Sequence, residues 1–276
     1  MRVATFNVLG PSNPDWDRRK EVSAAALRRL NPDIVALQEV PIGSTPKVID
    51  ELLGTGYHVR GFARTDEQGG GAVLATRRPH RVVDEIDQRC TPRAQALSWA
   101  STLVVQVATS QGTVLVAHHK PSWQFGAEFE REQQALAAAR LVECHADKAD
   151  HAVVLGDFDA TPDAASMRFW RGRQSLDGIS VCYQDAWATV HPGAPGFTFT
   201  PANPLVRGGE MPAGQARRID YILIRAGDHG PTLQVARCDL VLDQPVGGVW
   251  ASDHFGVVAD LTTPEHAPAS WSVVSP

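Results

Sequence analysis

The stretch that most constrains the fold of this chain is VVLGDFDATPD, from Val153 to Asp163. A short apolar run ends in Gly156, and Asp157 and Asp159 follow with one residue between them. The pattern predicts a buried strand whose carboxyl end carries both acids, and open α/β sheets bind their ligands at that end. Because side chains alternate along a strand, both carboxylates are expected on the same side of the sheet.

Two carboxylates this close repel each other unless a cation, a proton or strong hydrogen-bond donors neutralise them. A hard divalent cation such as Mg²⁺ is the simplest explanation. The alternative needs no ligand: Asp159 caps a helix that begins near Asp163, and Asp157 is a turn residue. This motif alone is compatible with both interpretations.

Length and composition favour one globular domain. The chain has 276 residues, of which 43% are apolar and 21% charged, so it can bury a sizeable core. No linker-like stretch divides it, and we expect a single domain over residues 1–263. The tail, residues 264–276, is rich in Pro, Ala and Ser and is expected to be mobile. The net charge of −5 argues weakly against a protein that grips nucleic acid mainly through phosphates.

The cysteines and the N-terminus bear on the compartment. The four cysteines are widely scattered and form no C-x-x-C pair, so zinc and a disulfide framework are both disfavoured. Reduced cysteines are typical of intracellular proteins. The sequence shows neither a secretory signal nor a run long enough to span a bilayer, and we expect a soluble, cytoplasmic protein. No feature indicates a protein partner.

The first part of the chain predicts a β-α-β unit. Residues 3–9 and 34–40 have strand-like patterns, and residues 16–30 between them have helical periodicity. Asn7 lies near the end of the first strand and Glu39 at the end of the second. An acid after a run as apolar as IVAL is either a solvated exit residue or a ligand, and the β-α-β context favours a ligand.

The middle of the chain predicts a hairpin and then a long helix. The hairpin consists of residues 97–107 and 113–117, and His118 and His119 stand at the exit of its second arm. Adjacent residues of a strand point to opposite faces, so at most one of these histidines enters any given site. The helix, residues 128–146, is expected to bury an apolar stripe and to keep its charged residues on a mostly solvated or salt-bridged surface. The expected stripe is Phe129, Leu136, Ala139 and Val142; the expected solvated or salt-bridged residues are Glu130, Arg131, Glu132 and Arg140.

The last part of the chain adds further candidates. Residues 186–214 are rich in Gly, Pro, Asn and aromatic residues, which indicates a long structured loop region. The run RRIDYILI predicts a strand that buries Asp220, and a buried acid needs a partner. Asp253 and His254 precede a final strand at residues 255–261.

Together these polar residues suit one reaction. The candidates at strand ends or inside strands are Asn7, Glu39, His118, Asp157, Asp159, Asp220, Asp253 and His254. Carboxylates and an amide oxygen bind a hard cation, the cation neutralises phosphoryl oxygens, and a histidine paired with an aspartate handles the proton. The set therefore indicates hydrolysis of a phosphoester.

The sequence resembles the endonuclease/exonuclease/phosphatase superfamily, which includes DNase I-like nucleases, abasic-site endonucleases, neutral sphingomyelinases and inositol polyphosphate 5-phosphatases. The matching pieces occur in the family's order over nearly the whole chain: TFNV at Asn7, LQEV at Glu39, VAHH at His118, EREQQ at Arg131, GDFDATP at Asp157, RIDYIL at Asp220 and SDHFGV at Asp253 and His254. The resemblance implies a DNase I-like four-layer α/β sandwich, with two packed mixed β-sheets flanked by helices.

The resemblance also implies a metal site. Glu39 is similar to the family's main metal ligand, assisted by Asn7 and by Asp253. The implied cofactor is Mg²⁺, with Mn²⁺ as an alternative.

The expected catalytic residues are Asp157, His254, Asp220 and His118, which match family positions, and Asp159. Asp157 is similar to the acid that aligns or deprotonates the attacking water. His254 resembles the histidine that contacts the scissile phosphate, with Asp220 as its orienting partner, and the pair can act as a base or as a cationic clamp. His118 matches the position of a second phosphate-contacting histidine.

One position departs from the family pattern. The family usually reads G-D-x-N, and here Asp159 replaces the asparagine. An amide can donate a hydrogen bond to a phosphate oxygen, whereas an ionised carboxylate only accepts. Asp159 must therefore be protonated, bind metal or have another role.

The expected function is divalent-metal-dependent hydrolysis of a phosphoester, with a phosphodiester in nucleic acid or a nucleotide as the leading substrate. A phosphomonoesterase or a phospholipid phosphodiesterase of the same superfamily is the alternative. A catalytically silent phosphate-binding module is disfavoured, because Glu39, Asp157, Asp220 and His254 are all present. Substrate choice is expected to lie in the 186–214 region, where the candidates are Trp187, Phe197, Phe199, Asn203 and Arg207. Its aromatic residues either stack on a base or pack the loop.

Overall fold

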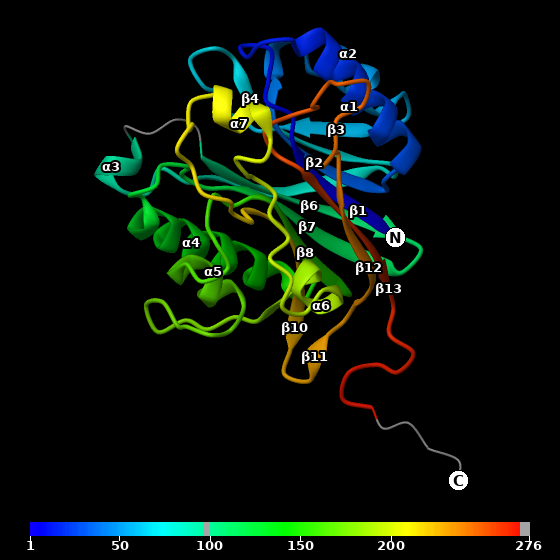
Figure 1. Cartoon of the computed structure of the whole chain (residues 1–276). Helices are drawn as coiled ribbons and strands as arrows, with labels where there is room; N and C mark the ends of the chain where they lie inside the picture. Colours follow the sequence, from blue (N-terminus) through cyan, green and yellow to red (C-terminus); the bar gives the residue numbers. More distant parts are fainter. Residues whose placement is uncertain (96–99, 271–276) are drawn as a thin grey trace.

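Two mixed β-sheets and the helices outside them make up the computed structural model, which describes residues 1–95 and 100–270 (Figure 1). The six-stranded sheet has the order β12-β13-β1-β2-β4-β3, in which β1 and β2 are parallel. Its strands are β1 (Arg2–Asn7), β2 (Ile34–Pro41), β3 (His58–Gly61), β4 (Gly70–Thr76), β12 (Gln234–Val241) and β13 (Gly256–Thr262).

The seven-stranded sheet has the order β11-β10-β8-β7-β6-β5, and β9 pairs with β10. Its strands are β5 (His80–Asp87), β6 (Ser101–Thr109), β7 (Gly112–Lys120), β8 (His151–Asp157), β9 (Tyr183–Asp185), β10 (Asp220–Gly227) and β11 (Gly230–Pro231). Strands β7 and β8 are parallel. Helix α4 (Glu128–Ala146) connects them, as a parallel connection requires.

Three apolar clusters define the layers. The inner cluster lies between the sheets and includes Val3, Ile34 and Val153. The residues that alternate with them face the helices: Val35 packs in the cluster that α1 and α2 cover, and Val154 packs in the cluster under α4 and α5. Strands buried on both faces explain the apolar runs of the sequence. The four-layer sandwich expected from the resemblance is confirmed.

Helices α1 and α2 cover the six-stranded sheet, and apart from α4 the other helical segments are short. The helical segments other than α4 are α1 (Trp16–Leu30), η1 (Ile42–Ser44), α2 (Thr45–Leu53), α3 (Pro92–Gln95), α5 (Ala165–Trp170), α6 (Ala186–Val190) and α7 (Pro204–Gly208). The predicted bounds of α1 and α4 are confirmed. Helix α1 stops at Asn31, whose φ of 47° is a left-handed C-cap. None of the described helices is long and apolar enough to cross a membrane.

The structure corrects the face expected for α4. Phe129 is 61% exposed, whereas Glu130 and Arg131 are buried. The Arg131 guanidinium explains the difference, because it turns back to donate to the carbonyl oxygens of Ser122 and Gln124 at 3.0 and 2.8 Å. The helix start thus holds the preceding loop instead of facing solvent.

Two further segments differ from expectation. Strand β7 runs on to Lys120, so His118 and His119 lie inside the strand and not at its exit. The predicted first arm of the hairpin began at residue 97, but residues 96–99 lie outside the described residues. Beyond Thr262 the described residues 264–270 form neither helix nor strand, and the mobility of the tail stays a prediction.

Candidate active site

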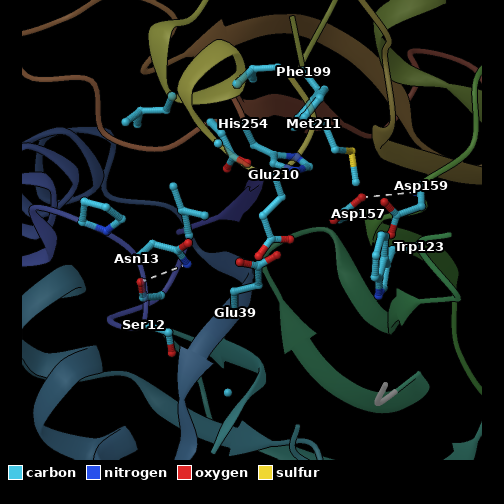
Figure 2. Close-up of a pocket in the computed structure, with 18 of the residues that line it drawn as sticks. Ser12, Asn13, Glu39, Trp123, Asp157, Asp159, Phe199, Glu210, Met211 and His254 are labelled. Carbon is cyan, nitrogen blue, oxygen red and sulfur yellow. Dashed lines mark hydrogen bonds between the residues drawn. The ribbon is translucent and has the colours of Figure 1, made fainter. Parts of the chain in front are cut away.

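A cavity of about 610 Å³ opens where several strand ends of both sheets meet (Figure 2). Strands β1, β2, β7 and β8 end there, and β10 and β13 begin there. The acids of its lining are Glu39, Asp66, Asp157, Asp159, Glu210 and Asp253; the basic side chains are Lys120, Arg217 and His254. The sandwich therefore gathers at one edge most of the acids that the sequence placed at strand ends.

Glu39 reaches the cavity through a local irregularity of β2. The pairing of β2 with β4 shifts register between Gln38 and Val40, and Glu39 has a φ of 60°. A bulge of this kind redirects a side chain at a sheet edge. The loop after β1 lies close against it, because a Cβ on Gly10 would be 2.4 Å from the Glu39 carbonyl oxygen.

Asn7 connects two of the acids. Its Nδ2 donates to Glu39 Oε1 at 2.8 Å and to Asp157 Oδ2 at 3.2 Å. Its Oδ1 accepts from the Leu9 amide at 3.0 Å. In this orientation Asn7 offers donors to the carboxylates and its oxygen is turned away from them.

Asp157 and Asp159 share a cation supplied by the chain itself. Lys120 Nζ donates to Asp157 Oδ2 at 2.9 Å and also to Asp159 Oδ2. The strands approach closely here, since a Cβ on Gly156 would lie 2.1 Å from the His119 carbonyl oxygen. The glycine that ends the VVLG run is therefore required for β8 to reach this register.

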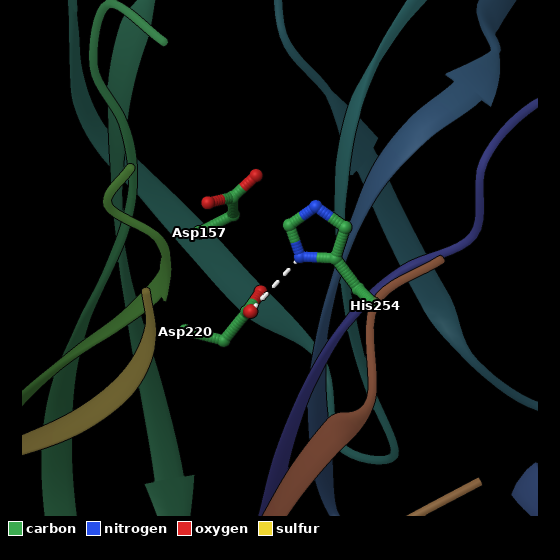
Figure 3. Close-up of side chains that lie close together, drawn as sticks. All are labelled: Asp157, Asp220 and His254. Atoms are coloured by element: carbon green, nitrogen blue, oxygen red, sulfur yellow. Dashed lines mark hydrogen bonds and ion pairs between the residues drawn. The ribbon is translucent and has the colours of Figure 1, made fainter. Parts of the chain in front are cut away.

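Asp220 and His254 form the ion pair that the sequence suggested (Figure 3). His254 Nδ1 and Asp220 Oδ2 are 2.9 Å apart, and both side chains are buried. The Phe199 ring packs edge-on against the imidazole at a centroid distance of 5.2 Å. Asp157 lies beside the pair, with ligand atoms of all three residues within 4.8 Å of one another.

The charges of this cluster support distinct protonation states. Burial alone would raise the pKa of Asp157, but Lys120 and His254 outweigh it and lower the pKa to about 2. Burial would lower the pKa of His254, but Asp220 and Asp157 raise it well above its usual value. Burial raises the pKa of Asp220 to about 6. At neutral pH Asp157 and Asp220 are therefore carboxylates and His254 is an imidazolium.

Glu39 has a raised pKa and no ion-pair partner among the described residues. Burial, and then the nearby Asp253 carboxylate, raise the pKa of Glu39 to about 7. Among the described residues, neither Glu39 nor Asp253 forms an ion pair with a basic side chain. Figure 2 shows the Glu210 carboxylate pointing toward Glu39 as well. This donor set fits a hard divalent cation, which carboxylate oxygens bind.

His118 lies between the sheets and does not line the cavity. It is 0% exposed, its Nε2 is 2.7 Å from Gln38 Nε2, and its ring packs on Phe62 at 4.8 Å. Burial, with the neighbouring His119, lowers the pKa of His118 to about 3, so the ring is neutral and accepts from Gln38. His119 points the other way, toward Phe158 and Trp170.

Phe199 lines the cavity, but the other substrate-binding candidates, Trp187, Phe197, Asn203 and Arg207, do not. Trp187 packs against the inner core and donates to the Ala194 carbonyl oxygen at 3.1 Å. Asn203 is fully buried, and its side chain donates to the Ser252 carbonyl oxygen at 2.7 Å. Arg207 is exposed on α7. The 186–214 region instead contributes Phe199, Leu205, Val206, Glu210 and Met211 to the lining.

Lys120 and the buried Arg19 were not identified from sequence. Arg19 is 1% exposed and donates to the carbonyl oxygens of Val8, Leu9 and Pro14 at 3.1, 2.7 and 2.7 Å. It thereby anchors the loop after β1, as Arg131 anchors the loop after β7. The residue spacing could have indicated Lys120, because it is two positions after His118 and therefore lies on the same face of the strand.

Two packed mixed sheets with an acid-and-histidine cavity at their shared edge define a DNase I-like α/β sandwich. Residues 4–254 match the Endonuclease/Exonuclease/phosphatase family, and the chain belongs to this family. Members of the family are hydrolytic enzymes that act on phosphoester bonds.

Solved structures share the fold. An endonuclease/exonuclease/phosphatase from Bacteroides vulgatus has a TM-score of 0.69 and 21% identity, covering 95% of this chain and 98% of that one. D. rerio TDP2 complexed with a single-strand DNA product has a TM-score of 0.71 and 18% identity, covering 95% and 99%. The human nocturnin catalytic domain with bound sulfate has a TM-score of 0.66 and 20% identity, covering 96% and 94%. A comparison with curated protein sequences found no match.

Proposed function

We propose that this chain hydrolyses a phosphodiester with the aid of a divalent cation, Mg²⁺ or Mn²⁺, and that water attacks the phosphorus in line with the leaving group. The observation that carries the proposal is the convergence of Asp157, the Asp220–His254 ion pair and the poorly neutralised Glu39 and Asp253 on one cavity. The leading substrate is a phosphodiester in nucleic acid or a nucleotide.

Asp157 is proposed to orient the attacking water. Its low pKa makes it a weak base, so its contribution is a fixed hydrogen-bond acceptor that aligns the water. His254, held charged by Asp220, is proposed to donate to a phosphoryl oxygen and to stabilise the charge that develops there.

Glu39 and Asp253 are proposed to bind the cation, and Asn7 to hold the Glu39 carboxylate in place through Nδ2. A divalent cation bound there neutralises phosphoryl charge. This donor set is preferred over Asp157, Asp220 and His254, because those three already have partners in Lys120 and in each other.

Aromatic side chains favour a nucleotide substrate. Trp123 lines the cavity and is 38% exposed, and Phe199 lies beside His254. The partly exposed ring of Trp123 can stack on a base. D. rerio TDP2, which shares the fold, has been seen with single-strand DNA product, and human nocturnin with sulfate. A phosphomonoester or a phospholipid remains the alternative, because loops decide the substrate within one fold.

The test is turnover of bis(p-nitrophenyl) phosphate beside p-nitrophenyl phosphate, with Mg²⁺ or Mn²⁺ and then with chelator. We expect cation-dependent diester cleavage that Asp157→Ala and His254→Ala each lower by about 10²- to 10⁴-fold. The matched controls are Asp50→Ala and His58→Ala, which change exposed residues outside the cavity.

The outcomes separate the candidates. Cleavage of the monoester alone would replace the diesterase by a phosphomonoesterase. If the protein binds the cation but cleaves none of the two esters, single-strand DNA or a phospholipid, the result would favour a silent phosphate-binding module.

A further inference from the structure

Lys120 is a cation buried at the point where a metal ion was expected. Its side chain is 6% exposed, and its ammonium group contacts the carboxylates of Asp157 and Asp159 at the edge of the cavity. An ammonium group has three donors. Two of them are used by the two aspartates, so this pair of acids is already held together by a positive charge.

We propose that Lys120 takes the place of a second divalent cation, so that the site binds one such ion, at Glu39 and Asp253, and none between Asp157 and Asp159. The inference rests on the proposed function for its catalytic meaning. The number of bound ions is nevertheless measurable without any substrate.

Electrostatics supports a division of the cavity into two parts. Asp157 and Asp159 share one fixed positive charge, and a divalent ion between them would have to displace or adjoin the ammonium. Like charges a few ångströms apart in a partly desolvated site repel strongly. Glu39 and Asp253 form no direct ion pair among the described residues, so a cation bound there displaces no ammonium or guanidinium group that is already bonded to them.

The same pair explains the departure at position 159. An asparagine would offer the Lys120 ammonium a neutral oxygen, whereas Asp159 supplies a second carboxylate that binds the same ammonium group. The Asp159 backbone, at a φ of 52°, donates its N–H to Asp157 Oδ1 at 3.2 Å. This turn directs the Asp159 carboxylate to Lys120. The acid at 159 and the lysine at 120 therefore form one unit.

The experiment counts Mn²⁺ ions by calorimetric titration and by electron paramagnetic resonance. We expect one ion per chain for the unmodified protein and for Lys120→Arg, which keeps the charge. Lys120→Gln leaves both acids without a cation, and we expect it to bind two. The double variant Lys120→Gln/Asp159→Asn lacks one of these acids and is expected to return to one ion. Glu39→Gln is expected to weaken the first site by about tenfold or more.

Several results would overturn the inference. They are two ions in the unmodified protein, none in it, or a single unchanged ion in a folded Lys120→Gln. If Lys120→Gln fails to fold, the double variant is tested in its place, because it does not bury two unpaired acids. Two ions bound to the double variant would also contradict the inference. Diester hydrolysis by a protein that binds two ions would reject the inference and keep the proposed function. A protein that binds one ion but does not hydrolyse the diester would reject the proposed function and keep the inference.

Discussion

The Nδ1 of His254 lies 2.9 Å from the Oδ2 of Asp220, and this contact joins the segment before β13 of one sheet to the first residue of β10 in the other. Because Nδ1 is engaged with the carboxylate, Nε2 is the nitrogen left for the cavity. In Figure 3 the imidazole is attached to the His254 backbone on one side, and Asp157 lies on the opposite side of the ring. One ion pair thus decides both the charge and the orientation of the ring.

Asp220→Asn is expected to lower the pKa of His254, because the amide removes the main negative partner of the imidazolium. If the charged ring is the active form, the alkaline limb of kcat/KM then moves to lower pH by a unit or more, and kcat falls by about 10²-fold or more. The check is a pH profile of diester cleavage, with Asp50→Asn as the control. An unmoved alkaline limb would contradict a charged His254 in catalysis.

Glu39 makes metal-free stability depend on pH. Its folded pKa of about 7 lies above the value of 4.5 for a free glutamate, so between these values the folded chain keeps a proton that the unfolded chain has released. The free energy of unfolding therefore falls as pH rises from 4.5 through 7. Glu39→Gln cannot ionise, and at pH 8 in chelator we expect it to be more stable than the unmodified protein by about 2 kcal/mol.

Urea unfolding at pH 5 and pH 8 measures this difference, with the exposed Glu67→Gln as the control. Added Mn²⁺ is expected to stabilise the unmodified protein at pH 8 and to have a much smaller effect on Glu39→Gln. Equal stabilisation of both proteins would place the cation elsewhere.

Asp159→Asn restores the residue usual in the family. The asparagine oxygen can still accept from Lys120, and its NH₂ adds a donor near the cavity. We expect activity to be kept or raised, whereas Asp157→Ala loses about 10²-fold or more. Steady-state rates of the two variants side by side decide the matter; an equal loss in both would give Asp159 a direct catalytic role.

His118→Gln is expected to act on stability and not on turnover. The ring is buried and bonded to Gln38, so the change disturbs a polar contact between the sheets and costs about 2 kcal/mol. Denaturant unfolding and kcat should be measured on the same preparation, beside His254→Gln. A loss of kcat at unchanged stability would support the phosphate contact inferred from the family resemblance.

Arg19→Met is expected to loosen the loop after β1, because five carbonyl groups between Val8 and Pro14 lose a donor. The loop lines the cavity, so KM should rise more than kcat falls, and stability should drop by about 2 kcal/mol or more. Arg18→Met, at an exposed neighbouring position, is the matched control. Identical kinetics in both variants would leave Arg19 a purely structural residue.

The sequence by itself determined the elements whose signals are local. Apolar periodicity was sufficient for the bounds of α1 and of α4. Apolar runs that end in an acid located the cavity edge at Glu39 and Asp157. These predictions succeed because the hydrophobic pattern of a few neighbouring residues is enough to indicate a regular helix or a strand that is buried on both faces.

Only the tertiary structure decided which side chains meet. Lys120 lies 37 residues from Asp157 in sequence, and its pairing depends on the length of β7 and its register beside β8. The same register buries His118 against Gln38 of the other sheet. Phe129 became exposed because Arg131 turned inward to a loop. Such contacts join distant segments, and their energies depend on burial and on neighbouring charges that no local pattern contains.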